Sequence, residues 1–153
     1  KASFERYSEA VQARIYATPP GITGIGSIVF RDEEKLLTAR ELWERLAAEG
    51  DPGSQYFMSF FYQAGIAGVE RDEARSLRLL NSAAEGNYAL AQTSLAIRYE
   101  LGREVDQDWD AAVDWYRRAA INGSNVARSR LYEAYTYGEL GLPKDAEQAR
   151  QWE

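Results

Sequence analysis

The sequence predicts an all-α fold, an α-solenoid in which similar helix-turn-helix hairpins stack on one another. An alanine pair recurs every 36 residues, at Ala47-Ala48, Ala83-Ala84 and Ala119-Ala120. A column of mixed residue sizes repeats with the same interval, because Ala91, Leu95, Tyr99 and Gly102 recur as Ala127, Leu131, Tyr135 and Gly138. The period of a single helix cannot produce this interval. Stacked copies of one unit do, since each copy needs a residue of the same size at the same place.

Residues 1–37 lie outside this repeat and are expected to form an N-terminal helix followed by a loop. The helix is predicted from apolar residues at helical spacing, namely Phe4, Tyr7, Val11 and Ile15. Pro19-Pro20 should end it, and the glycines between residues 21 and 26 favour a tight loop leading into a short extended segment at residues 27–30. Asp32 is a candidate N-cap for a short helix through Leu36-Leu37.

Seven helices are expected after residue 37. Thr38 can cap the first of them, and each helix should end at a glycine, or at an asparagine, that adopts a left-handed conformation. The expected ranges are about 38–48, 54–64, 72–84, 89–101, 109–121, 125–137 and 145 to the C-terminus. The second to seventh helices form three hairpins, and together residues 38–153 make up the predicted repeat domain.

Composition excludes several function classes. The 24 acidic residues outnumber 18 basic ones, and a net charge of −6 does not favour nucleic acid as a partner. The chain has no cysteine and no histidine, which removes thiolate chemistry, Cys-based zinc sites and His-based catalytic triads. No catalytic residue, metal site or cofactor is predicted. The longest apolar stretch, residues 56–62, is too short for a transmembrane segment, and no leader precedes Lys1, so a mature protein or an excised fragment is expected.

Three local features suggest binding, and each also has a structural interpretation. The aromatic group at residues 56–62 resembles a peptide-binding patch, but its helical spacing favours core packing, with a role as the socket for the N-terminal helix. The acidic residues Asp106, Asp108 and Asp110 suggest calcium, but helix capping is favoured because the glycine and glutamate of a calcium loop are missing. The loop from Gly21 to Gly26 suggests phosphate binding, but a connecting turn is favoured because no lysine accompanies it.

The repeat resembles a known family. The pattern A-x3-L-x3-Y-x2-G followed by D-x3-A-x2-W-x3-A-A, clearest from Ala91 to Ala120, is similar to the Sel-one-like repeats, relatives of the tetratricopeptide repeats. The first copy departs from it, since Ser54 and Met58 replace the expected alanine and leucine. The resemblance implies a right-handed α-solenoid whose first helices line a concave surface. It also implies an adaptor for other proteins or, in some bacterial members, a link to envelope polysaccharide pathways.

The N-terminal stretch resembles a second family. The segment Pro20-Gly21-Ile22-Thr23-Gly24, together with residues 27–34, is similar to the C-terminal part of bacterial sugar transferases, which move a sugar phosphate onto undecaprenyl phosphate. The resemblance covers residues 4–37 and implies a loop for phosphate or a nucleotide sugar at Gly21, Thr23, Gly24 and Arg31. The family's catalytic Asp-Glu pair and membrane-inserted helix have no counterpart here. Proximity to a membrane therefore requires a missing upstream domain.

A second candidate site lies on the first helices of the hairpins. If Ala91, Leu95 and Tyr99 face inward, the adjoining residues form a polar face with one aromatic side chain, which suits a peptide or a glycan. The predicted binding residues on these helices are Gln92, Arg98, Arg128, Tyr132 and Thr136. The alternative is that this face is only solvated.

We therefore expect a non-catalytic repeat scaffold for protein or glycan partners. The competing hypothesis is the C-terminal portion of a sugar-phosphate transferase in which the repeats regulate the enzyme or recruit partners during exopolysaccharide assembly. A bacterial cytoplasmic location, or the cytoplasmic face of the inner membrane, is favoured over the periplasm. The sequence does not specify the partner or the oligomeric state.

Overall fold

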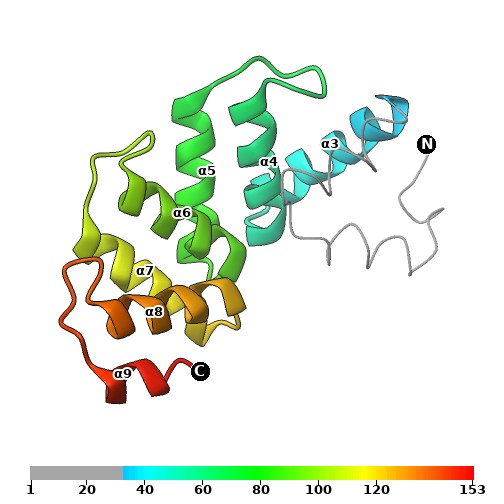
Figure 1. Cartoon of the computed structure of the whole chain (residues 1–153). Coiled ribbons are helices and arrows are strands. Elements are labelled where there is room, and N and C mark those ends of the chain that lie inside the picture. Colours follow the sequence, from blue (N-terminus) through cyan, green and yellow to red (C-terminus); the bar gives the residue numbers. More distant parts are fainter. Residues whose placement is uncertain (1–32) are drawn as a thin grey trace. The chain divides into compact units, whose positions relative to one another are not determined.

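The computed structural model describes residues 33–153, with side chains from residue 39, and this part of the chain is entirely helical (Figure 1). The fold class predicted from the repeat is confirmed. The helices are α3 (Glu33–Ala48), α4 (Pro52–Ala64), α5 (Glu73–Glu85), α6 (Ala89–Leu101), α7 (Trp109–Ile121), α8 (Asn125–Tyr137) and α9 (Ala146–Arg150). They match the seven predicted helices in order, and α4 to α8 agree with the predicted bounds within two residues at each end, whereas α9 ends at Arg150 instead of reaching the C-terminus.

The first described helix is longer than predicted. We expected a short helix near Leu36-Leu37 and a separate helix capped by Thr38, whereas α3 runs without a break from Glu33 to Ala48. No glycine or proline interrupts this stretch, so nothing forces the helix to end at Thr38. The predicted N-terminal helix, the glycine loop and the extended segment lie outside the described residues. The division into residues 1–37 and 38–153 therefore remains a prediction.

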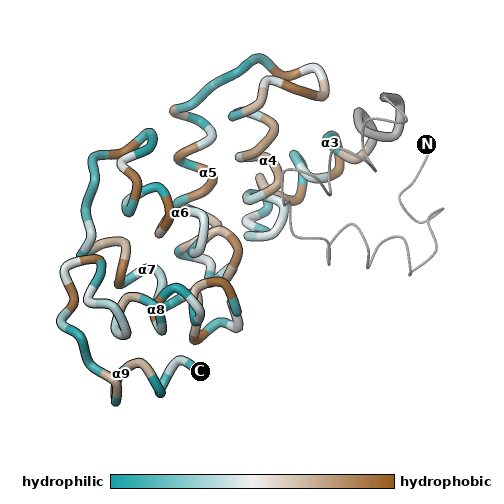
Figure 2. The backbone as a smooth tube through the Cα atoms, in the orientation of Figure 1, coloured by the Kyte–Doolittle hydropathy of each residue, from teal (hydrophilic) through white to brown (hydrophobic). Residues whose placement is uncertain are grey.

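The chain divides into two compact units, Lys1–Ser76 and Leu77–Glu153, so that the division falls inside α5. In the second unit, apolar and polar residues alternate along the helices (Figure 2). Buried apolar residues of α6, α7 and α8 form one shared core. That core is built around small residues of α6, α7 and α8, including the fully buried Ala96, Ala112 and Ala127. Tyr116 and Leu131 fill the remaining volume. The alanines allow the helices to approach closely, as the repeat pattern predicts.

In the first unit, the core between α3 and α4 is aromatic. Trp43 of α3 stacks on Phe57 of α4 with ring centroids 4.9 Å apart, and Phe61 lies 5.5 Å from the same indole. Phe57, Phe61 and Tyr62 are buried, which confirms the interpretation of the aromatic group as core. Its predicted role as a socket for the N-terminal helix concerns residues outside the described part.

The first alanine pair is not in register with the other two. At the ends of α5 and α7, the backbone N–H groups of Tyr88 and Ser124 donate to the carbonyls of Ala83 and Ala119. At the end of α3, the N–H of Asp51 donates to Leu46 instead. A residue in the left-handed conformation follows each of these helices: Gly50 after α3, Asn87 after α5 and Gly123 after α7, with φ of 96°, 62° and 96°. The equivalents of Ala83-Ala84 are therefore Leu46-Ala47, the first interval is 37 residues, and the predicted 36 was wrong there.

Candidate interaction surface

Tight caps fix the helices on which the candidate surface lies. Gly102 and Gly138 end α6 and α8 in the left-handed conformation, with φ of 64° and 74°, and a Cβ at Gly138 would lie 2.9 Å from the Lys144 side chain. Asp108 caps α7 by accepting a 2.9 Å hydrogen bond from the N–H of Ala111. This confirms the capping interpretation of the acidic group around Asp108.

One side of α6 is buried by its hairpin partner α7 together with the end of α5 and the start of α8. Gln92 is fully buried; its Nε2 donates to the carbonyl oxygen of Ala84 at 3.0 Å, and its Oε1 accepts from Nδ2 of Asn122 at 2.9 Å. Thr93 shares a 2.8 Å hydrogen bond with Ser124, the N-cap of α8, and Ala96 is fully buried in the core. These residues of α6, together with Glu100, form the stacking face of α6, which contacts both α7 and α8.

A charged network completes the stacking face. Tyr116 of α7 donates to Oε2 of Glu100 at 2.6 Å, and Arg130 of α8 donates to Oε1 from Nη2 at 2.6 Å and from Nε at 3.0 Å. Arg130 also pairs with Glu139. The side chains of Arg130 and Glu100 are only 22% and 17% exposed, so both charges are largely removed from water. Such a pair fixes the positions of α6 and α8 relative to each other.

The network changes the proton affinities of its members. Burial raises the pKa of the Glu100 carboxyl, but the hydrogen bonds from Arg130 and Tyr116 outweigh it, and the net pKa lies below the usual 4.5. Burial, and then the hydrogen bond to Glu100, raises the pKa of Tyr116. The hydrogen bond to Glu100 raises the pKa of Arg130 despite burial. At neutral pH Glu100 is therefore ionised and Tyr116 is a neutral donor.

The corresponding side of α8 is exposed. Arg128, Ser129, Tyr132 and Thr136 occupy the positions of Gln92, Thr93, Ala96 and Glu100, and we call these four residues the α8 face. Tyr132 is 36% exposed, whereas its equivalent Ala96 is fully buried. Thr136 donates to the Tyr132 carbonyl at 2.7 Å, and Arg128 is hydrogen-bonded to Asn125. The α8 face is thus largely exposed, since Arg128, Ser129 and Tyr132 are exposed and Thr136 is half-buried.

The structure separates the residues predicted to form the binding face. Arg128, Tyr132 and Thr136 lie together on α8. The prediction that Gln92 lies on an exposed binding face was wrong. Its side-chain amide donates to Ala84 and accepts from Asn122, so both polar atoms are bonded to neighbouring parts of the protein. Arg98 is on α6 and is ion-paired with Glu104, with 11% of its side chain exposed. The residues of the predicted phosphate or nucleotide-sugar loop, Gly21, Thr23, Gly24 and Arg31, lie outside the described residues.

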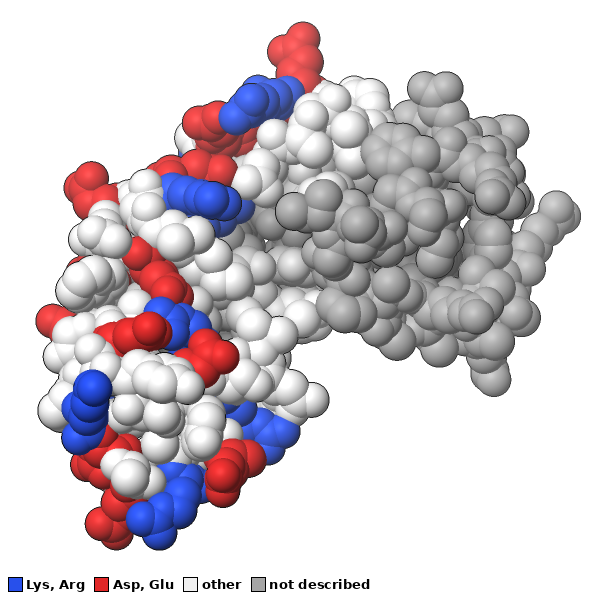
Figure 3. Space-filling model, viewed as in Figure 1, with Lys and Arg blue, Asp and Glu red and all other residues white. Residues whose placement is uncertain are grey.

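The charge on this side of the second unit is mixed. Figure 3 shows Lys and Arg interspersed with Asp and Glu over α6 to α9, without a large field of one sign. Several of these charges are paired, as in Arg118 with Glu85 at 3.8 Å and Arg117 with Asp114 at 3.5 Å. Long-range attraction of a strongly charged polymer is therefore not favoured, and recognition depends on individual side chains.

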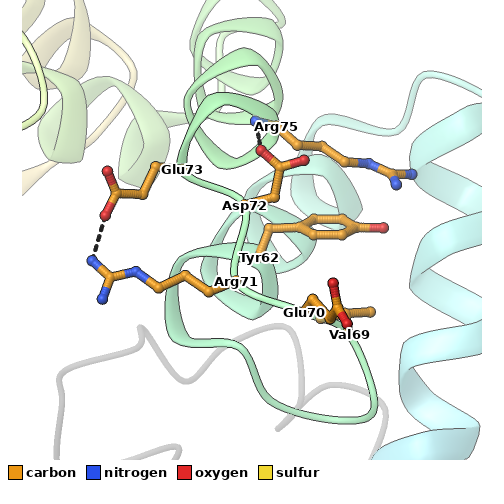
Figure 4. A pocket seen from close by; sticks show the side chains of 7 residues that line it. All are labelled: Tyr62, Val69, Glu70, Arg71, Asp72, Glu73 and Arg75. Atoms are coloured by element: carbon orange, nitrogen blue, oxygen red, sulfur yellow. Dashed lines mark hydrogen bonds and ion pairs between the residues drawn. The ribbon is translucent and has the colours of Figure 1, made fainter.

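The first unit contains an open hollow of about 720 Å³ at the turn between α4 and α5 (Figure 4). Its lining residues are Tyr62, Val69, Glu70, Arg71, Asp72, Glu73 and Arg75. The Arg75 guanidinium lies 4.2 Å from the centre of the Tyr62 ring, and the Tyr62 hydroxyl donates to Glu44 at 3.3 Å. Burial raises the pKa of Tyr62. Arg71 pairs with Glu73, so much of the charge here serves to hold the turn.

No helix in the described part of the chain combines the length and apolar character needed to cross a bilayer.

The chain matches the model of the Sel1 repeat in four copies, at residues 22–51, 52–88, 89–124 and 125–152. The second copy is 37 residues long and the third is 36, in agreement with the corrected register. The first copy begins at residue 22, within the segment predicted to form the glycine loop, and extends across residue 38.

Relatives share this repeat over part of their length. The human protein sel-1 homolog 2 is 31% identical over 87 residues, which are 57% of this chain and 12% of that protein. The chitin synthase regulator SKT5 of Saccharomyces cerevisiae is 33% identical over 109 residues, 69% of this chain and 16% of that protein. The chain thus spans only a small part of the length of these relatives.

Solved structures show the same architecture. A Sel1 repeat protein from Oxalobacter formigenes is 36% identical with a TM-score of 0.69, covering 74% of this chain and 85% of that one. The protective antigen c5321 of uropathogenic Escherichia coli is 29% identical with a TM-score of 0.65, covering 74% of this chain and 24% of that one. With four matched repeats across most of its length and this shared fold, the chain belongs to the Sel1 repeat family.

Proposed function

We propose that this protein is a non-catalytic scaffold that binds a partner protein through the α8 face. The observation that carries the proposal is the difference between two equivalent positions. Ala96 on α6 is fully buried in the core formed with α7 and α8, whereas Tyr132 on α8 is 36% exposed. Tyrosine at the centre of an exposed face provides a large, rigid contact with a polar end, as is common at protein interfaces.

The relatives support an interaction role. Two of them are named as regulators of chitin synthase, in Saccharomyces cerevisiae and in Schizosaccharomyces pombe. A regulator acts by binding another protein, and stacked repeats present an extended surface for this purpose. The concave surface implied by the family resemblance is part of the proposal, since α8 is the first helix of its repeat. A glycan is the alternative ligand, because Ser129, Tyr132 and Thr136 carry hydroxyl groups.

A photo-crosslinking amino acid at position 129 tests the proposal. In extracts of the source organism we expect a discrete protein to crosslink from position 129 and not from position 147, which is exposed on α9. Tyr132→Ala should weaken the interaction by at least about tenfold if Tyr132 is a hot spot. Crosslinking of the same proteins from both positions, or of no protein from position 129, would contradict the proposal. Crosslinking to polysaccharide would indicate the glycan alternative.

The second candidate is the C-terminal part of a sugar-phosphate transferase, with the repeats regulating it or recruiting exopolysaccharide enzymes at the cytoplasmic face of a bacterial membrane. It depends on the Pro20-Gly21-Ile22-Thr23-Gly24 segment and the residues that follow it. Titration with a uridine diphosphate sugar and with an isoprenoid phosphate tests it, with Arg31→Ala as the variant. Binding that is lost in Arg31→Ala would support this candidate, and the absence of binding to either ligand would exclude the loop as its site.

A further inference from the structure

The stacking face of α6 presents hydrogen-bond acceptors to α7 and α8. Oε1 of Gln92 accepts from Asn122, and the Glu100 carboxylate accepts from Arg130 and Tyr116. Tyr116 belongs to α7, the partner of α6 in its own hairpin, and Asn122 is the C-cap of α7, while Arg130 belongs to α8 of the following hairpin. Helices packed on α6 in this way therefore need a face that offers acceptors at these two positions.

The α8 face has the opposite polarity at the same positions. Arg128, which has only donors, replaces Gln92, and Thr136, whose hydroxyl already donates within α8, replaces the Glu100 carboxylate. A helix pair that carried the donors of Asn122 and Arg130 in the same places would meet a cation and a neutral side chain on α8. It would lose the hydrogen bonds that join α6 to the end of α7 and to α8.

Size as well as polarity distinguishes the α8 face. The position of Tyr132 is occupied by Ser59 in α4 and by Ala96 in α6, and both of these small residues are buried. A tyrosine ring placed at such a close helix contact would overpack it. The α8 face therefore does not match a pair of Sel1 helices packed on it as α7 and α8 pack on α6.

Arg128 is available to an external acidic group. No carboxylate in the described part of the chain forms an ion pair with it, and its hydrogen-bond partner is the neutral side chain of Asn125. Arg130, two residues away, is engaged by Glu100, Glu139 and, at 3.8 Å, Glu133. These contacts also tie Glu133, the exposed acidic residue nearest in sequence to Tyr132, to Arg130.

We propose that the α8 face binds an acidic peptide segment of a partner protein, with a carboxylate of the segment on Arg128 and an apolar side chain of the segment against Tyr132. The proposal rests on the proposed scaffold function and specifies the chemistry of the partner. Arginine and carboxylate form charge-assisted, often bidentate hydrogen bonds, and the tyrosine ring supplies the apolar contact. Ser129 and Thr136 border the two anchors with small polar side chains.

Two fluorescent peptides of equal length and with identical leucines test the proposal, one carrying glutamates and the other lysines at the remaining positions. Anisotropy titrations use the full chain and the variants Arg128→Gln and Tyr132→Ala, both of which install the α6 residue type. Arg150→Gln, at an exposed arginine of α9, is the control for the loss of one positive charge. Circular dichroism checks that every variant is folded.

We expect the acidic peptide to bind more tightly than the basic one, and Arg128→Gln to weaken it by about tenfold, while Arg150→Gln changes it by less than about twofold. Arg128→Glu should reverse the preference towards the basic peptide, and added salt should weaken binding of the acidic peptide. Equal binding of the two peptides, no binding of the acidic one, or an unchanged affinity in Arg128→Gln would overturn the proposal. The crosslinking result from position 129 is independent of these outcomes, so failure of the scaffold function is recognised separately.

Discussion

The two units differ in the side chains that form the core between their packed helices. Between α3 and α4 the core contains stacked rings, with Trp43 against Phe57 and Phe61. Between α6, α7 and α8 it contains alanines and leucines, with the Arg130–Glu100 pair at its margin. Both units nevertheless keep the buried glutamine that donates to the end of the preceding helix, Gln55 to Ala47 at 3.3 Å and Gln92 to Ala84 at 3.0 Å.

This comparison indicates that the backbone turns, rather than a particular core residue, define the repeat. The reversals after Leu46-Ala47 and after Ala83-Ala84 have the same hydrogen bonds although the first pair contains a leucine. Core residues can then change between aromatic and aliphatic types, provided that the buried volume is filled. The four predictions below test where stability resides in each unit.

The largest effect is expected in the aromatic core of the first unit. Phe57→Ala should lower the free energy of unfolding by about 3–5 kcal/mol, because it removes a buried ring stacked on Trp43 and leaves a cavity. Urea denaturation followed by tryptophan fluorescence and by circular dichroism measures it. Phe60→Ala, at a half-buried ring, is the control and should cost clearly less. Equal costs for the two variants would show that the stacked pair has no special role.

In the second unit the largest polar contribution is expected from Glu100. Glu100→Gln should cost about 2–3 kcal/mol, because the charge-assisted bonds from Arg130 weaken while Arg130 stays largely buried. Glu133→Gln, which removes an exposed carboxylate 3.8 Å from the same arginine, should change stability by less than about 1 kcal/mol. If the two variants were equally stable, the Glu100 pair would be no more than a surface contact.

The same carboxylate predicts a pH dependence. The pKa of Glu100 is lower in the folded protein than its usual 4.5, so its stabilising contribution is fully present above that value and is lost as the pH falls through the folded pKa. The difference in unfolding free energy between the wild type and Glu100→Gln should therefore be constant near neutral pH and shrink in acid. Denaturation curves at a series of pH values measure this difference. A difference that grows in acid would contradict the assigned direction.

The helices and their packing columns were predictable because residues of one size recur at one interval. The Glu100–Arg130 pair was not predictable in this way, since the equivalent positions hold Thr136 and Ser94 and neither charge repeats. Gln92 was misplaced because a polar residue beside an apolar stripe has the same pattern whether it is solvated or stacked. The recurrence of glutamine eight residues after Ala47 and after Ala84 was the available signal. Because Ala48 follows Ala47, the sequence contains an alanine pair one residue after the true equivalents, Leu46-Ala47. This pair suggested an interval of 36 residues where the structure has 37.

The smallest effect sharpens the comparison most directly, because it exchanges equivalent residues between the two units. Ser54 of α4 and Ala91 of α6 are both fully buried, and the Ser54 hydroxyl has no hydrogen-bond partner among the described residues. Ser54→Ala should therefore stabilise the protein by up to about 1 kcal/mol, and Ala91→Ser should destabilise it by about 1–3 kcal/mol. Paired denaturation curves measure both changes. Loss of stability in Ser54→Ala would contradict the prediction. It would mean that the Ser54 hydroxyl makes a stabilising contact that has no equivalent at Ala91, so that the two units differ at this position by more than side-chain size.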